Sequence, residues 1–206
     1  MDPSWINALK RSYSTNRILD HCNILSVATL QNSFPKIFHL RFQFFSLNSL
    51  CFYIDKRSLL CSLLLSQPSE FLWHFPLTSE FFKFSGPVFL EPSSEILSKH
   101  WSSLSAKEKE SFCGLPPDLV LESSESNDLD SFKPQEALQT SEHFAVIVLS
   151  PGLVEHSQFV DKSAIGNTRK TFESLPQPDG ISRKWLHALK DSVWETNEVN
   201  APCSRP

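Results

Sequence analysis

Residues 36–58, KIFHLRFQFFSLNSLCFYIDKRS, carry the pattern that decides the fold. Apolar residues in the first half alternate with polar ones, so that an extended chain would place them on two faces. One face takes Phe38, Leu40, Phe42 and Phe44, and the other takes Ile37, His39, Arg41 and Gln43. Alternation with a period of two is typical of a β-strand with one buried face. SLNS then predicts a hairpin connection to a second strand, residues 50–54.

Short apolar runs on both sides of this hairpin predict further strands at residues 24–30, 69–75 and 80–90. Gly86-Pro87 interrupts the last run and indicates a bulge or a sheet edge. A short helix is expected from Ser58. Several strands with short connections favour an antiparallel meander that closes on itself over alternating βα units. We therefore predict a mainly β (α+β) fold with peripheral helices.

The remaining segments complete one predicted domain, residues 1–206. Residues 2–13 read as a helix capped by Asp2 or Ser4, with Trp5, Leu9 and Tyr13 on one apolar stripe. Further helices are expected at 93–101, at 104–112 with a Ser105–Glu108 capping box, and at 181–192. Further strands are expected at 143–151, 153–160 and 194–199. Residues 117–141 are predicted to be a mobile excursion, and a polar extension starts at about 173.

Composition narrows the function classes. The chain of 206 residues has a formal net charge of -4 and scattered basic pairs, which argues against nucleic acid as a partner. The 5 cysteines are odd in number and form no C-x-x-C pair, so neither a disulfide framework nor a zinc site is indicated. No apolar run is long enough to span a bilayer, so no membrane partner is expected. These features predict an intracellular, cytoplasmic protein, with the nucleus left open.

The basic turn at the end of the second strand is the first candidate site. Arg57 can offer planar donors to a phosphate, and Ser58 a hydroxyl at the start of a helix. The ordinary interpretation is a solvated surface turn, because basic turns are common. Arg41, on the polar face of the preceding strand, can supply a second cation, or it is simply exposed there. Lys36 falls on the opposite face, so Lys36 and Arg41 can touch one ligand only at a twisted or dimeric site.

Other catalytic patterns are absent from the sequence. It has no P-loop, no G-x-G-x-x-G and no G-x-S-x-G motif. Glu155 and His156 form a tempting pair, but adjacent residues of a strand point to opposite faces, and we assign them no catalytic role. No side chain stands out as a general base, and the catalytic residues are unknown.

Several motifs occur in an order that resembles a known family. They are S-V-A-T-L at 26–30, P-K-x-x-x-L-R-F at 35–42, F-Y-I-D-K-R-S at 52–58, W-x-F-P-x-T-x-E-x-F-x-x-S-G at 73–86, W-x-x-L-S-x-x-x-x-x-x-F at 101–112, L-S-P-x-x-V-E at 149–155 and W-E-T-N-E-V-N-A-P at 194–202. This order resembles the pyridoxamine 5′-phosphate oxidase-like flavoproteins, in their divergent FMN-binding branch. The resemblance covers roughly residues 5–172 and 194–202.

The resemblance implies a split β-barrel that forms a homodimer and holds FMN at the subunit interface. It also implies which residues contact the cofactor: Lys36 and Arg41 on the strand, Tyr53 and Ile54 at the F-Y-T pair of the family, Arg57 and Ser58 at its R-S, Phe81 at a flavin-contacting Gln, and Arg169 in a C-terminal basic cluster. Leu59 and Leu60 replace the Arg-Lys of the oxidase pattern, and the R-x-H that clamps substrate phosphate is not recognisable.

The resulting hypothesis is an FMN-binding protein resembling pyridoxamine 5′-phosphate oxidase, a flavin-dependent oxidoreductase of unknown substrate. Vitamin B6 oxidation itself is the less favoured role, because the substrate clamp is missing. The alternative is a flavin-free split barrel that serves as a binding or scaffolding module. Leu59, Leu60 and Phe81 favour this alternative, whereas Lys36, Arg41, Arg57 and Ser58 favour FMN.

Overall fold

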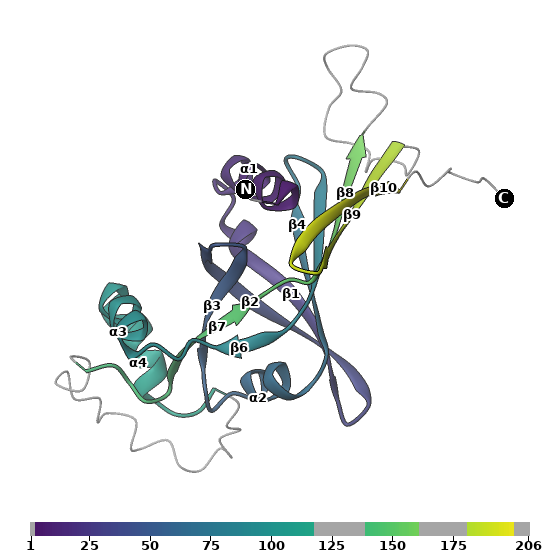
Figure 1. Cartoon of the computed structure of the whole chain (residues 1–206). Helices are drawn as coiled ribbons and strands as arrows, with labels where there is room; N and C mark the ends of the chain where they lie inside the picture. The colour runs from purple at the N-terminus through teal and green to yellow at the C-terminus, as the bar shows by residue number, and fades with distance from the viewer. Residues whose placement is uncertain (1–2, 118–138, 161–180, 200–206) are drawn as a thin grey trace. The chain divides into compact units, whose positions relative to one another are not determined.

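The computed structural model describes residues 3–117, 139–160 and 181–199 (Figure 1). Its ten strands are hydrogen-bonded in the order β10-β9-β8-β5-β4-β1-β2-β3-β7-β6. The elements are α1 Ser4–Asn16, η1 Asp20–Asn23, β1 Ile24–Gln31, β2 Phe34–Ser46, β3 Ser49–Asp55, α2 Leu59–Ser66, β4 Ser69–Phe75, β5 Glu80–Ser85, β6 Val88–Leu90, α3 Ser94–Ser103, α4 Ala106–Cys113, β7 Phe144–Leu149, β8 Leu153–Val160, β9 Ile181–Lys190 and β10 Val193–Val199. The mainly β architecture expected from the sequence is confirmed.

The chain divides into two compact units, each assembled from segments that are distant in sequence. The terminal unit comprises Met1–Val27, Glu70–Gly86 and Pro151–Pro206, and the central unit comprises Ala28–Ser69 and Pro87–Ser150. The expectation of one domain over residues 1–206 stays a prediction. The excursion expected at 117–141 falls largely on residues 118–138, outside the described part.

The terminal unit packs α1 against its strands. Trp5, Ile6 and Leu9 are buried on one face of α1, as helical spacing predicts. The Trp5 ring meets Phe84 at 6.1 Å and Trp194 at 5.3 Å between ring centroids. The cap expected at Ser4 is wrong, because Pro3 holds the N-cap position and Ser4 lies inside the helix. Its hydroxyl is 3.0 Å from the Thr196 hydroxyl on β10.

The helix predicted at 181–192 is wrong, since these residues form β9 and the following turn. β9 pairs antiparallel with β8 from Leu153 opposite Ala188 to Val160 opposite Ile181. It then turns at Asp191-Ser192, where φ is 48° and 67°, into β10. Positive φ at both turn residues is the geometry of a two-residue hairpin. Pairing along the whole segment thus overrides a local pattern compatible with a helix. The strand expected at 194–199 is confirmed as β10.

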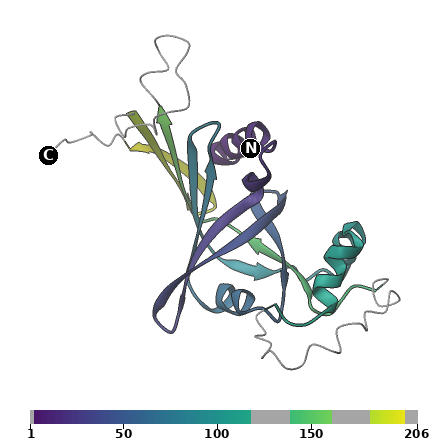
Figure 2. The same cartoon turned by 180° about the vertical axis from the view of Figure 1, so that it is seen from behind.

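The central unit has apolar side chains on both faces of β3. Leu50, Phe52 and Ile54 are buried on one face. The other face carries a second cluster, in which α3 and α4 cover Cys51, Phe144, Val146 and Val148 with Trp101 and Leu104. Figures 1 and 2 both show α3 and α4 side by side near the start of β7.

A β-bulge corrects the alternation expected along β2. Phe42 pairs with Phe52, but Phe44 pairs with Cys51, so Gln43 is the extra residue. The bulge moves Phe44 to the face that α3 and α4 cover, where it packs on Tyr53. Phe45 takes the place beside Phe42, at 4.6 Å between ring centroids. The expectation that Phe44 shares a face with Phe42 is therefore wrong.

The other elements follow the expected pattern closely. The run at 80–90 breaks at Gly86-Pro87 into β5 and β6, and β6 is the last strand of the order. Ser105 and Glu108 form the predicted capping box of α4. Within the described ranges, no helix combines the length and the apolar character needed to cross a bilayer.

Candidate functional site

The basic turn between β3 and α2 is built around Ser58. Its hydroxyl oxygen accepts a hydrogen bond from the Cys61 backbone N–H at 3.1 Å, which caps α2. The same hydroxyl donates to the Asp55 carbonyl at 2.7 Å and closes the turn. Ser58 is buried. The hydroxyl expected to face a phosphate is therefore engaged in starting the helix.

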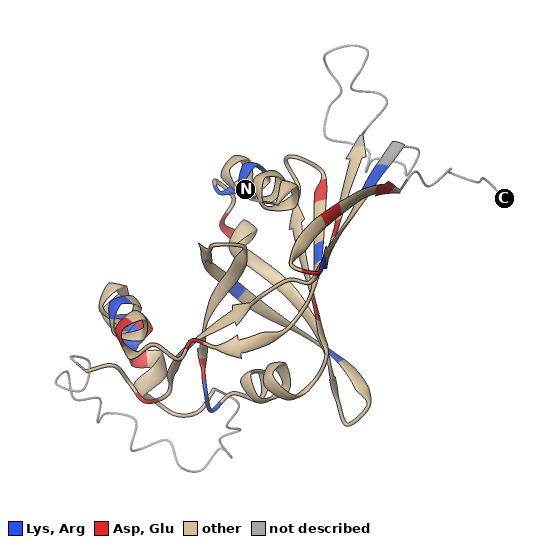
Figure 3. Ribbon diagram, in the orientation of Figure 1, with Lys and Arg blue, Asp and Glu red and all other residues tan. Residues whose placement is uncertain are grey.

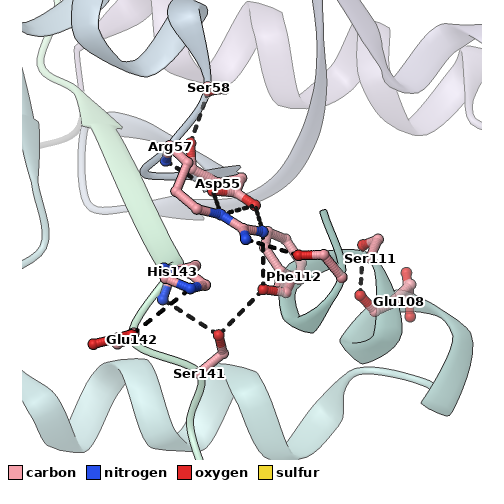
Figure 4. A network of polar contacts seen from close by, with 10 residues as sticks. Asp55, Arg57, Ser58, Glu108, Ser111, Phe112, Ser141, Glu142 and His143 are labelled. Carbon is pink, nitrogen blue, oxygen red and sulfur yellow. Dashed lines mark hydrogen bonds and ion pairs between the residues drawn. The ribbon is translucent and has the colours of Figure 1, made fainter. Parts of the chain in front are cut away.

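The Arg57 guanidinium also has partners within the protein, as Figure 4 shows. Its Nε and Nη2 donate to the two carboxylate oxygens of Asp55, at 3.0 and 2.6 Å. Nη1 also donates to the Gly114 carbonyl at 2.7 Å, and Nη2 to the Phe112 carbonyl at 3.2 Å. The side chains of Arg57 and Asp55 are 21% and 8% exposed. The hydrogen bonds to Asp55 raise the pKa of Arg57.

A half-buried, bidentate pair of this kind is much stronger than an ion pair in open solvent. A phosphate at this turn has to compete with Asp55 and with two backbone carbonyls for the guanidinium. Lys56, between the two partners, is exposed. Figure 3 shows charged residues of the central unit on α3, on α4, at this turn and on β2.

Arg41 and Lys36 are both exposed on β2. Arg41 lies on the face that α4 covers, because it alternates with the buried Leu40 and Phe42. Hydrogen bonds from Ser105 lower the pKa of Glu108 at the first turn of α4, and the positive charge of Arg41 contributes. Arg57 thus contacts the end of α4, and the charge of Arg41 acts on its first turn. Lys36 is in phase with Leu40 and Phe42, on the other face of the strand.

Tyr53 and Ile54 point to opposite faces of β3. The Tyr53 hydroxyl is 2.9 Å from His100 Nδ1 on α3, and the His100 ring stacks on Phe44 at 4.1 Å. Burial raises the pKa of Tyr53 and lowers the pKa of His100. Ile54 is buried with Leu50 and Phe52. A ligand on the Tyr53 face can therefore reach the backbone of Ile54 but not its side chain.

The other expected contacts lie elsewhere. Phe81 belongs to β5 of the terminal unit, where its ring stacks on His74 at 4.2 Å and meets the edge of Phe159 at 5.5 Å. Arg169 lies outside the described residues. The remaining expected contacts all belong to the central unit.

A second cluster, around Glu80 in the terminal unit, has no counterpart among the sequence predictions. Glu80 is 1% exposed, and its Oε1 lies 3.0 Å from His156 Nε2. The Ser12 hydroxyl donates to Glu80 Oε2, and Arg11 Nη2 lies 3.4 Å from Oε1. Burial raises the pKa of Glu80, but hydrogen bonds from His156, Ser12 and Thr78 outweigh it and bring the pKa to about 2.

His156 lies between the rings of Phe82, at 4.2 Å, and Trp185, at 4.7 Å. His187 shares this face, and its Nδ1 is 2.9 Å from the Thr196 hydroxyl. Burial lowers the pKa of His187 to about 4, and the nearby His156 contributes. No partner among the described residues reaches its Nε2.

The sequence contained one signal for this cluster. Glu80 is in phase with Phe82 and Phe84, whose side chains are buried, so a carboxylate is placed on the inner face of β5. The expected separation of Glu155 from His156 is confirmed. Glu155 faces outward, where Lys83 and Lys184 lie 3.3 and 2.6 Å from its carboxylate oxygens.

Comparison with known proteins places the fold. No protein-family model and no curated protein sequence matches the chain. A pyridoxamine 5′-phosphate oxidase-related, FMN-binding protein from Nostoc punctiforme PCC 73102 has a similar structure, with a TM-score of 0.74 and 24% identity over 97% of this chain and 98% of that one. PhzG from Burkholderia lata 383, crystallised with tetrahydrophenazine-1-carboxylic acid, has a TM-score of 0.72 and 16% identity over 97% and 94%. The split-barrel fold implied by the sequence motifs is therefore confirmed.

Proposed function

We propose that this chain, which has the split-barrel fold of the pyridoxamine 5′-phosphate oxidase-related proteins, binds FMN as a homodimer. The observation that carries the proposal is the similarity in fold to an FMN-binding protein over 97% of one chain and 98% of the other. When bound, FMN supplies redox chemistry, and the chain supplies the pocket and the charges that hold it. A flavin-dependent oxidoreductase acting on an unidentified substrate is the finer form of this proposal.

The exposed cations of the central unit support the proposal. The phosphate of FMN is close to dianionic at neutral pH, and Lys36, Arg41 and Lys56 have exposed side chains. No described residue donates to or accepts from the head groups of Lys36 and Arg41. These two side chains start from opposite faces of β2, so a single FMN meets both only where the strand is strongly twisted or where a second copy of the chain completes the site, and we propose the second arrangement. The homodimer is part of the proposal for this reason.

The turn at Arg57 fits a phosphate less well. Arg57 and Ser58 already have protein partners, so the turn as folded offers an anion only the exposed Lys56. Lys36 and Arg41 on β2 are therefore available to the phosphate of FMN as they stand. At the turn, Arg57 can bind this phosphate only after it gives up hydrogen bonds to Asp55 or to the carbonyls of Phe112 and Gly114.

The test is a titration of the purified full-length protein with FMN, followed by visible absorbance and flavin fluorescence. Arg41→Ala and Lys36→Ala are each expected to weaken FMN binding by about tenfold, because each removes a charge-assisted contact to phosphate. Lys107→Ala is the matched control, since it removes one exposed positive charge on α4. A colourless protein whose spectra do not respond to FMN at about millimolar concentration would overturn the proposal.

The dimer is tested separately by analytical ultracentrifugation. The proposal expects a species of twice the chain mass, and it expects FMN to strengthen the association. A chain that binds FMN as a monomer contradicts the shared site while leaving FMN binding intact.

A flavin-free binding or scaffolding module is the second candidate. The engagement of Arg57 by Asp55 favours it, since a pair of opposite charges presents little net charge to an anion. Leu59 and Leu60, at the start of α2, add apolar groups where the oxidase pattern has cations. This candidate predicts that Arg41→Ala and Lys107→Ala have the same negligible effect in the FMN titration.

A further inference from the structure

α4 is held to the central unit by few contacts. It has only 8 residues and buries none of them completely. A helix this short is marginal alone, so its attachments decide whether it stays folded in place. Phe112 packs its ring against Trp101 and Phe144, at 6.1 and 5.1 Å between ring centroids. Cys113 also packs against this cluster, and Lys109 Nζ lies 5.8 Å from the centroid of the Trp101 ring. The polar attachments are made by carbonyl oxygens at the end of the helix.

Arg57 makes the strongest of these polar attachments. It donates to the Phe112 and Gly114 carbonyls, and the Phe112 carbonyl also accepts a hydrogen bond from the Ser141 hydroxyl at 3.3 Å. The last carbonyls of a helix carry partial negative charge and lack partners within the helix, so a guanidinium there is favourable. Both carboxylate oxygens of Asp55 accept hydrogen bonds from that guanidinium and hold it in place.

We propose that Arg57 is an anchor that α4 and a bound phosphate group compete for. In the ligand-free chain Arg57 fastens the end of α4 to the β3–α2 turn, and a phosphate that takes Arg57 releases α4. This inference rests on the proposed function, in that the anion expected at the turn is the phosphate of FMN. Nη1 and Nη2 donate to the carbonyls of Gly114 and Phe112 in the ligand-free chain. A phosphate that binds the guanidinium through two of its oxygens uses N–H groups of the same two nitrogen atoms, so it competes with these carbonyls.

The competition is reciprocal by thermodynamic linkage. If α4 docking weakens phosphate binding by some factor, phosphate binding weakens α4 docking by the same factor. Asp55 belongs to the docked side of this equilibrium, since its carboxylate holds Arg57 toward the helix and repels an anion. Removal of the Asp55 charge therefore shifts the equilibrium toward phosphate.

Hydrogen exchange of the full-length protein, read by mass spectrometry on peptides that cover residues 106–114, tests the anchor. Arg57→Gln is expected to speed exchange of this segment by about tenfold, the loss that follows when hydrogen bonds to a charged donor are removed. Arg57→Lys keeps the positive charge but loses the planar set of N–H donors. The exchange rate of residues 106–114 in this variant is expected to lie between those of the natural chain and Arg57→Gln. Lys107→Gln, which removes an exposed charge from the same helix, is the control and leaves the exchange unchanged. Equal exchange in Arg57→Gln and Lys107→Gln overturns the anchor.

Inorganic phosphate, compared with chloride at equal ionic strength, tests the competition. Phosphate is expected to speed exchange of residues 106–114 in the natural chain, at several-fold lower concentration in Asp55→Asn, and not at all in Arg57→Gln. If phosphate changes nothing in either the natural chain or Asp55→Asn, the competition is wrong.

The outcome is separable from that of the proposed function. FMN that binds with unchanged exchange of residues 106–114 overturns the competition and leaves FMN binding standing. If exchange of residues 106–114 responds to phosphate but the protein does not bind FMN, the competition stands and the proposed function is wrong.

Discussion

Glu80 on β5 and His156 on β8 meet at 3.0 Å, and both side chains are almost completely buried. The Ser12 hydroxyl of α1 donates to the same carboxylate. The pair therefore joins α1 to two strands of the terminal unit. A buried carboxylate is tolerated only when hydrogen bonds replace its hydration, so the three groups depend on one another.

Glu80→Gln is expected to lower the free energy of unfolding by about 3 kcal/mol, because it removes a buried carboxylate that accepts hydrogen bonds from Ser12 and His156 and turns an amide N–H toward one of them. Urea unfolding at neutral pH measures the loss. Glu155→Gln is the matched control, since Glu155 pairs with Lys83 and Lys184 near the surface and its loss is expected to cost under about 1 kcal/mol. Equal losses in the two variants would contradict the assigned role of Glu80.

Acid is expected to destabilise the terminal unit in two successive pH windows that meet between pH 4.5 and 4. The pKa of His187 is lowered from 6.5 to about 4 in the folded chain, so between these two pH values His187 is protonated in the unfolded chain and neutral in the folded one. The contribution of His187 to the free energy of unfolding is therefore fully present above pH 6.5, and the free energy of unfolding falls by about 3 kcal/mol as the pH drops to 4. The pKa of Glu80 is lowered from 4.5 to about 2, so its contribution is present above pH 4.5 and is lost toward pH 2.

His187→Asn separates the two windows, because its amide can replace Nδ1 without titrating. The variant is expected to lose the slope of unfolding free energy between pH 6.5 and 4.5, where only His187 contributes, and to keep the slope below pH 4. Urea unfolding across this pH range is the measurement. An unchanged slope in the upper window would show that His187 is not the group that titrates there.

Tyr53→Phe is expected to cost about 1 kcal/mol, since it removes the hydrogen bond to His100 and keeps the ring packed on Phe144. A double-mutant cycle with His100→Phe isolates this bond, because Phe keeps the stack on Phe44. The expected coupling energy is again about 1 kcal/mol. A coupling near zero would mean that the hydroxyl and the imidazole do not interact in solution.

Ser58→Ala is expected to destabilise the ligand-free protein by about 1 kcal/mol, because α2 loses its N-cap and the turn loses the bond to the Asp55 carbonyl. Ser62→Ala in the same helix is the control. Ser62 is exposed, and its change is expected to stay within about 0.5 kcal/mol. If thermal unfolding shows no difference between the two variants, Ser58 does not cap α2 in solution.

The candidate site could be predicted only in part. Arg41, Arg57 and Ser58 were selected because cations and a hydroxyl flank a strand and a turn, and this local arrangement is present. The partners of Arg57 could not be predicted, since the carbonyls of Phe112 and Gly114 lie more than fifty residues away in sequence. The FMN contacts of all these residues stay predictions.

The sequence by itself determined the phase of β2 as far as Phe42, the start of α2 at Ser58 and the capping box at Ser105. These features depend on neighbours within a few residues, and alternation or a capping hydroxyl acts at that range. Only the tertiary structure decided the bulge at Gln43, the strand at Ile181–Lys190, the Glu80–His156 pair and the engagement of Arg57. Each of these features depends on a contact with a segment that is distant in sequence. The free energy of such a contact depends on both segments together, so neither segment alone predicts it.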